Sequence, residues 1–356
     1  MKRLGNVRLL LAVALAGVCA GGLASCLGPG GPQVTITVTP SSGVVPLTIA
    51  FDGTSSTAAG GVTTYHWVFG TGDESYESTG TYTFVHAGTF VLSLTVRAAD
   101  GSSSTESAEI VVGPAVWITD SNLGRIYKLD MSGKALLTFN SPSPQPQGIT
   151  LAEAEGRLWL FVACQGGGLQ RIYRLDPTDG SVTGEFSAPG QSPRELTYGA
   201  DTPKRIWCVD GTSRTFYALD PTTGQVFESF GLSYFNSFPQ VRKDSFLRTP
   251  AGLDWTPQAL ASGYLWYLEG ENGLLFKMKI VPSYDIMSGT QLELVGDPLH
   301  VPISAVTAID WDGGYLWVVD VNEHEIVQID PETGERTGVK ITRFPGAATA
   351  GMEIER

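Results

Sequence analysis

The chain has 356 residues, of which 42% are hydrophobic and only 17% charged, and its formal net charge is −13. Low charge together with 43 glycines and many aromatic residues favours an all-β protein over a helical or disordered one. The negative charge argues against a nucleic-acid partner, because binding to phosphates needs basic stripes on the surface.

Residues 1–26 are predicted to be a lipoprotein signal peptide. A basic start is followed by an apolar run over residues 9–18 and then by small residues, an order typical of a secretory signal and too short for a membrane span. The segment Leu23-Ala24-Ser25-Cys26 resembles the bacterial lipobox, which implies diacylation of Cys26. We therefore expect an exported protein, anchored by lipid to the cell envelope at the outer membrane or cell surface. A plain cleaved signal with an incidental cysteine is the alternative.

Residues 27–32 are rich in glycine and proline and are predicted to be a flexible tether. Residues 33–113 then form a separate unit, with strand-like segments at 34–38, 46–52 and 89–96. Short strands separated by Gly and Ser turns over about 80 residues predict an antiparallel β-sandwich of the immunoglobulin type.

The run from Trp67 to Gly72, together with the run from Gly88 to Val96, resembles the polycystic-kidney-disease (PKD) repeat. This resemblance implies an immunoglobulin-like module with Trp67 in its core. Val68 and Thr71 stand where the family usually has acidic residues, which argues against a binding role for that loop. In exported bacterial proteins such modules are mostly spacers or accessory binders, so we expect a stalk.

Residues 114–356 contain an internal repeat in which a tryptophan recurs every 42 to 59 residues, and a four-stranded propeller blade typically occupies roughly 40 to 50 residues. Each unit divides into four strand-like pieces, and the tryptophan lies in the second. These tryptophans are expected at one core position of each blade: Trp117, Trp159, Trp207, Trp266 and Trp317. Because four short strands cannot bury both of their faces alone, neighbouring units must stack.

The repeat predicts a β-propeller of five blades. The chain enters at the second strand of one blade and ends with a lone first strand at residues 351–354, so we expect that strand to pair beside Trp117 and close the ring. A sixth, degenerate blade within residues 231–249 is the alternative.

The stretch from Ala308 to Gly334 resembles a large group of bacterial propellers. The group includes NHL-type and YVTN-type repeats, streptogramin-lyase-like and gluconolactonase-like proteins, and glutamine cyclotransferases. This resemblance implies the architecture and not an activity, because the same fold hosts binders, scaffolds and several chemistries.

The third position of each first strand carries a polar residue, namely Thr150, Thr197, Asp254, Asp310 and Glu353. Innermost strands line the channel of a propeller, so three carboxylates are expected at one level there. Carboxylates this close repel one another unless a cation neutralises them, and calcium prefers oxygen ligands. Asp254, Asp310 and Glu353 are therefore candidate calcium ligands or catalytic groups of a hydrolase, lyase or glycosidase. The alternative is a structural role in which they pair with arginine or backbone amides.

Three further groups are candidates for function. His300, in a predicted loop before a first strand, is a candidate base, with a solvated loop histidine as the alternative. Tyr234, Phe235 and Arg242 lie in an aromatic insert suited to a protein or carbohydrate partner, or to an extra hairpin on the rim. Cys164 and Cys208 either form a disulfide or stay as buried free thiols.

The sequence as a whole favours a non-enzymatic, lipid-anchored surface protein whose propeller binds a protein or glycan partner. A calcium-dependent enzyme acting in the channel is the second hypothesis.

Overall fold

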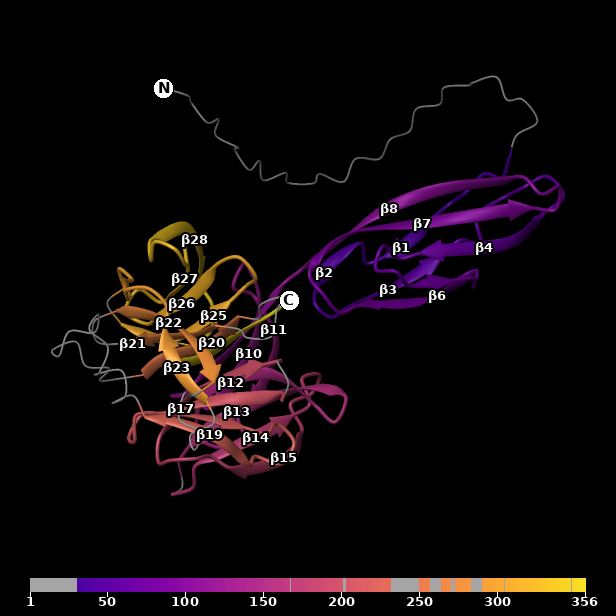
Figure 1. Ribbon diagram of the computed structural model, residues 1–356. Coiled ribbons are helices and arrows are strands. Elements are labelled where there is room, and N and C mark those ends of the chain that lie inside the picture. The colour runs from indigo at the N-terminus through magenta and orange to yellow at the C-terminus, as the bar shows by residue number, and fades with distance from the viewer. Residues whose placement is uncertain are drawn as a thin grey trace, which may run out of the picture.

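The computed structural model describes residues 31–166, 168–200, 203–231, 250–256, 264–269, 273–282, 290–303, 305–346 and 348–356. Its regular elements are all β-strands over these ranges, as the composition predicted. None of the described segments is a helix long and apolar enough to cross a membrane. Figure 1 shows two groups of strands, an elongated one from β1 to β8 and a larger one formed by the later strands.

The first group is a sandwich of two sheets. One sheet has the order β1-β3-β6 and the other β2-β8-β7-β4-β5. The strands are β1 (Thr37–Thr39), β2 (Ser42–Val44), β3 (Leu47–Asp52), β4 (Val62–Val68), β5 (Glu74–Ser75), β6 (Thr79–Phe84), β7 (Gly88–Ala98) and β8 (Ser103–Gly113).

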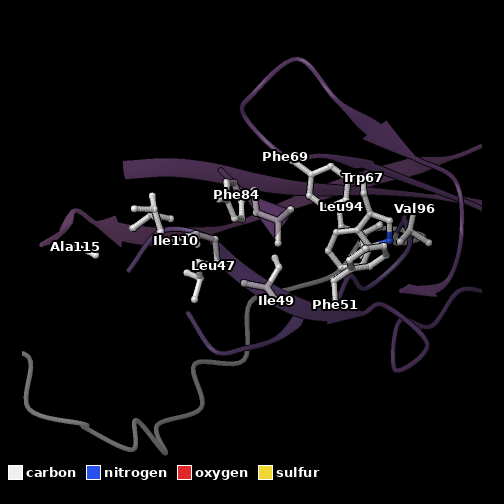
Figure 2. Packing of buried hydrophobic residues seen from close by; sticks show 13 residues of the cluster. Leu47, Ile49, Phe51, Trp67, Phe69, Phe84, Leu94, Val96, Ile110 and Ala115 are labelled. Atoms are coloured by element: carbon white, nitrogen blue, oxygen red, sulfur yellow. The ribbon is translucent and has the colours of Figure 1, made fainter. Parts of the chain in front are cut away.

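The sandwich core forms because apolar side chains alternate along the strands and meet between the sheets, as in β3, where every second residue is buried. Trp67 is fully buried, with its ring 4.9 Å from that of Phe51, and its indole N–H donates to the Glu77 carbonyl at 3.0 Å. Figure 2 shows this cluster, with Phe69 beside Trp67 and Ala115 at the far end. The prediction that Trp67 is a core residue is confirmed.

The second group, within the described residues, consists of five separate antiparallel sheets, and none of them closes on itself. Their orders are β11-β10-β9-β29, β12-β13-β14-β15, β16-β17-β18-β19, β20-β21-β22-β23 with β24 beside β22, and β25-β26-β27-β28. The strands are β9 (Ala115–Asp120), β10 (Arg125–Asp130), β11 (Ala135–Asn140), β12 (Gln145–Ala154), β13 (Arg157–Gln165), β14 (Arg171–Leu175), β15 (Val182–Ser187), β16 (Pro193–Gly199), β17 (Arg205–Asp210), β18 (Thr215–Leu219), β19 (Val226–Gly231), β20 (Pro250–Thr256), β21 (Tyr264–Glu269), β22 (Leu274–Pro282), β23 (Thr290–Leu294), β24 (Leu299–His300), β25 (Val306–Trp311), β26 (Leu316–Asp320), β27 (Glu325–Ile329), β28 (Arg336–Thr342) and β29 (Thr349–Glu355).

Burial falls from the inside of each sheet to its outer edge. All six residues of β9 are buried, whereas the outer strands β11, β15 and β19 alternate between exposed and half-buried side chains. A second strand covered on both faces needs a continuous apolar run, and an outer strand needs only one apolar face. This difference explains why the second strand of each unit has the clearest sequence signal and the fourth the weakest.

The five first strands contact one another in a cycle. β12 contacts β16, β16 contacts β20, β20 contacts β25, β25 contacts β29, and β29 contacts β12. β29 also pairs with β9, with Met352 opposite Ile118 and Glu353 opposite Trp117. The predicted closure by the last strand is therefore confirmed, and the second group has a propeller-like arrangement. The insert that was considered for a sixth blade falls mostly on residues 232–249, which lie outside the described residues.

The common position predicted for the five tryptophans is wrong for one of them. Trp159 pairs with Ala152, and Phe161 takes the place opposite Thr150 that Trp207 takes opposite Thr197. Phe161 is fully buried, whereas Trp159 is only half-buried. Strands β12 and β13 are the longest pair in this domain and extend beyond the core, so the Leu-Trp pair of residues 158–159 falls two positions further out.

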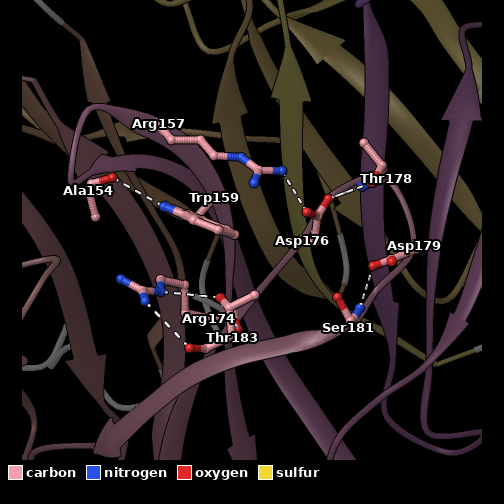
Figure 3. A network of polar contacts seen from close by, with 9 residues as sticks. All are labelled: Ala154, Arg157, Trp159, Arg174, Asp176, Thr178, Asp179, Ser181 and Thr183. Carbon is pink, nitrogen blue, oxygen red and sulfur yellow. Dashed lines mark hydrogen bonds and ion pairs between the residues drawn. The ribbon is translucent and has the colours of Figure 1, made fainter.

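In that outer position Trp159 lies between two guanidinium groups, as Figure 3 shows. The Cζ atoms of Arg157 and Arg174 lie 4.3 and 5.0 Å from its ring centroid, and its indole N–H donates to the Ala154 carbonyl at 3.1 Å. Trp159 is thus held by cation–π contacts at the edge of the core.

Glycine permits the close approach of the inner strands. A Cβ atom at Gly351 of β29 would overlap the Gln147 carbonyl oxygen and lie 2.7 Å from the Cα of Gly148. A Cβ atom at Gly148 would in turn overlap the backbone of Glu195 and Leu196 in β16. Both obstacles are backbone atoms, which cannot move aside as a flexible side chain would.

We predict that Gly351→Ala lowers the free energy of unfolding by about 2 kcal/mol or more, because overpacking against backbone forces the inner strands apart. Gly314→Ala is the matched control, since a Cβ there has Asp312 Oδ1 at 3.8 Å as its nearest neighbour, and it should change stability by less than about 0.5 kcal/mol. Urea unfolding of both variants tests this, and equal stabilities would contradict the close packing.

Candidate functional site

The five polar residues predicted to share one level occupy equivalent register positions. Each lies directly opposite the aromatic residue of its second strand: Thr150 opposite Phe161, Thr197 opposite Trp207, Asp254 opposite Trp266, Asp310 opposite Trp317 and Glu353 opposite Trp117. The predicted alignment of these positions is therefore confirmed. It places Asp254, Asp310 and Glu353 on three strands that follow one another in the cycle, β20, β25 and β29.

Asp310 is 97% buried, being 3% exposed, and its carboxylate accepts a hydrogen bond from the backbone N–H of Ile354 in β29. This bond joins the first strands of two adjacent sheets. Glu353 is half-buried, and Asp254 is described only in its backbone. Among the described residues, no group of three or more His, Cys, Asp or Glu side chains is placed to hold a metal ion. The described carboxylates alone do not provide a calcium site, and calcium binding by the three acids stays a prediction.

We predict that Asp310→Ala lowers the free energy of unfolding by about 1–3 kcal/mol, because it leaves the Ile354 N–H buried without its acceptor. The loss should be the same in calcium and in a chelator. Thermal melts of both proteins in the two buffers measure it, with the exposed Glu323→Ala as the control. A calcium-dependent rise in Tm that Asp310→Ala abolishes would contradict the structural role and favour a metal site.

The remaining sequence candidates are placed as follows. His300 is exposed and lies in β24, where it pairs with Leu274, so the loop predicted there is instead a two-residue strand at the edge of a sheet. Tyr234, Phe235 and Arg242 lie outside the described residues. Their roles, and that of His300 as a base, stay predictions.

Cys164 and Cys208 are buried free thiols in the structure. They belong to different hydrophobic clusters, Cys164 with Trp117 and Cys208 with Phe161. Burial raises the pKa of the Cys164 thiol to about 11, and burial, with the nearby carboxylates of Asp210 and Glu195, raises the pKa of Cys208 further. Both thiols are therefore protonated at neutral pH and are poor nucleophiles.

Sequence reasoning placed a boundary between residues 113 and 114 but did not identify the contacts that join the two groups of strands. Lys128 of β10 is 95% buried, being 5% exposed. Its ammonium group donates to the Val45 carbonyl of the sandwich at 2.6 Å and forms an ion pair with Glu355 of β29 at 2.7 Å. The same Glu355 carboxylate accepts the indole N–H of Trp117 at 2.8 Å. One lysine thus connects the sandwich, the first strand pair and the last strand of the chain.

A related arrangement, with a neutral glutamine in place of the lysine, occurs in the sheet of β25 to β28. Gln328 lies opposite Trp317, as Lys128 lies opposite Trp117. Gln328 and the Trp317 indole both donate to Asp312 Oδ2, at 3.2 and 2.6 Å.

Lys128 differs from Lys277, the lysine at the same position opposite Trp266, because its ammonium group reaches a carbonyl of the other domain. Arg174 occupies the same repeat position opposite Phe161. A basic residue at this position therefore does not mark the junction in the sequence.

We predict that Lys128→Met lowers the free energy of unfolding by about 3 kcal/mol, because it leaves the Glu355 carboxylate, whose side chain is only 11% exposed, without its cation. It should also broaden the distribution of distances between the two groups of strands in small-angle X-ray scattering. Gln328→Met, the matched control, should cost about 1 kcal/mol and leave the scattering unchanged. Identical scattering from Lys128→Met and the wild type would contradict a fixed junction.

Comparison with known proteins identifies the first group of strands. Residues 30–112 match the PKD domain family. The PKD1 domain of the Vibrio cholerae metalloprotease PrtV is 30% identical, in a match that covers 23% of this chain and 96% of that chain with a TM-score of 0.21. Residues 30–112 are therefore a PKD domain, as the sequence predicted.

The rest of the chain is similar to propeller-like structures. Myxococcus xanthus glutaminyl cyclase is 12% identical over 67% of this chain and 73% of that chain, with a TM-score of 0.39. A chain of a nidogen/laminin complex is 12% identical over 68% of this chain and 99% of that chain, with a TM-score of 0.44. No curated protein matches the chain.

Proposed function

We propose that the protein is a lipid-anchored cell-surface protein in which the PKD domain is a stalk and a five-bladed propeller binds a protein or carbohydrate partner. The cyclic contacts of the five first strands support the count of five blades. The proposed localisation is the outer membrane or cell surface, with Cys26 as the lipidated residue.

The junction is the observation that carries this proposal. Only Pro114 separates β8 of the PKD domain from β9 of the next sheet, and Ala115 of β9 packs in the PKD core. The buried Lys128 then fixes the PKD domain against this sheet. A module joined in this way holds its neighbour at a set distance and orientation, which is what a stalk requires. A flexible linker would leave the relative orientation free.

A calcium-dependent hydrolase or lyase is the second candidate function. The observation that favours it is the equivalent register of Asp254, Asp310 and Glu353 on consecutive first strands. The hydrogen bond from Ile354 to Asp310 supports a structural role instead, so the binding function is placed first.

Labelling with radioactive palmitate tests the anchor, and protease treatment of intact cells tests the surface location. We predict that the wild-type chain is labelled, sediments with membranes and is cut by external protease. Cys26→Ser should lose the label and leave the membrane fraction, because the thiol that accepts the lipid is gone. Cys19→Ser, the control within the predicted signal peptide, should keep both. Unchanged membrane fractionation of Cys26→Ser would contradict the anchor, and full protection from protease would contradict the surface location.

A further inference from the structure

A groove of about 450 Å³ lies on the propeller-like domain where the β9–β10 hairpin meets the connection from β11 to β12. This volume is within the range of roughly 300–1,000 Å³ that is usual for small-molecule sites. The residues that line it, here called the hairpin groove, are Asn122, Leu123, Gly124, Asn140, Ser141, Pro142, Ser143 and Pro144.

The hairpin groove is held in shape from beneath. The buried Asp120 carboxylate accepts the backbone N–H groups of Asn122 and Leu123 at 2.9 and 2.8 Å. The Ser141 N–H donates to the Gly124 carbonyl at 2.8 Å, which ties the hairpin to the facing connection. Gly124 has a φ of 61°, and a Cβ there would lie 3.3 Å from the Pro144 carbonyl oxygen. A site fixed in this way loses little conformational freedom when a ligand binds.

The lining has no charged side chain, although the chain as a whole carries a net charge of −13. The carboxamides of Asn122 and Asn140 are exposed, and neither makes a hydrogen bond to another described residue. Each carboxamide offers both donors and an acceptor. The serine hydroxyls already have partners: Ser141 Oγ lies 3.5 Å from Cys164 Sγ, and Ser143 Oγ donates to the Gln165 carbonyl at 3.4 Å. An anionic ligand would need a cation here, and a metal ion would need carboxylates.

Apolar surface lies beside these polar groups. The Leu123 side chain is 62% exposed, and Pro142 and Pro144 complete the lining. A ligand that suits both the polar carboxamides and the apolar surface is neutral, carries many hydroxyl groups and has C–H faces between them. Short neutral oligosaccharides have this chemistry, because hydroxyls point outward around each sugar ring and its C–H groups form an apolar face.

We propose that the hairpin groove binds the end of a neutral oligosaccharide, through the carboxamides of Asn122 and Asn140 and the apolar surface of Leu123. This inference rests on the proposed function, of which it names the site and the class of ligand.

Isothermal titration of the full-length chain with neutral oligosaccharides tests it, in a detergent without a sugar headgroup. The probes are the hexaoses of the cellulose, chitin, xylan and starch series, up to about 10 mM. We expect one series to bind and the double variant Asn122→Ala/Asn140→Ala to weaken its Kd about tenfold, because two neutral hydrogen bonds are lost. The control is Leu169→Ala on the next hairpin, 59% exposed and outside the lining, which should leave Kd within about twofold.

The contrary outcomes separate the groove from the proposed function. If the double variant binds as tightly as the wild type and has the same melting temperature, the hairpin groove is not the binding site. The proposal that the domain binds glycans would then still stand. Absence of binding in all four series overturns the neutral-glycan inference. Surface anchoring is tested separately by the Cys26→Ser experiment. If the double variant has a lowered melting temperature, the Leu123→Asp variant is used in its place. Oligosaccharide binding that is unchanged by this charge in the lining would also overturn the hairpin groove.

Discussion

The pairing of β29 with β9 is the constraint on which the second domain depends. A cycle of separate sheets has no ladder of strand-to-strand hydrogen bonds across its interfaces, so side-chain contacts and one shared sheet must hold it closed. Here the shared sheet combines the first and last strands of the domain, with Ile354 opposite Val116. The apolar side chains of β29, Met352 and Ile354, belong to the same cluster as Trp317 of the neighbouring sheet. Loss of this strand would expose one sheet edge and two interfaces together.

The attachment of the PKD domain depends on the same sheet. Glu355, near the end of β29, holds Lys128, and Lys128 holds the Val45 carbonyl of the PKD domain. Closure of the cycle and orientation of the stalk are thus properties of one group of contacts. In the proposed surface protein this arrangement has a clear consequence, because the domain that carries the hairpin groove has a defined position relative to the PKD domain. The groove lies on the β9–β10 hairpin, which belongs to this same sheet.

Much of the fold could be predicted from the sequence, because the same pattern of buried and exposed residues recurs in each of the sheets. The apolar second strands and their tryptophans predicted the five units. The lone strand at residues 351–354 predicted that the end of the chain pairs with β9. The register of Asp310 and Glu353 followed from the same alignment. Trp159 was misplaced because a recurring Leu-Trp pair looks the same at the centre of a sheet and at its edge.

The candidate site was predicted less completely. The position of Asp310 in its strand was evident, but its acceptance of the Ile354 N–H depends on how two sheets approach. No pattern in the sequence predicts the role of Lys128, because its partner is a backbone carbonyl 83 residues earlier in the chain. The hairpin groove likewise depends on two loops that meet only in the folded domain. Contacts between distant backbone segments carry no sequence period, and they decide what such a domain can bind.

Native-state hydrogen exchange of the backbone amides in β29 tests the closure most directly. If this strand closes the cycle, its amides exchange only through global unfolding, with the same free energy of opening as those of β9 and β17. Amides of β29 that exchange like a frayed terminus, while β9 and β17 stay protected, would show that the domain is stable without its last strand and would contradict this account.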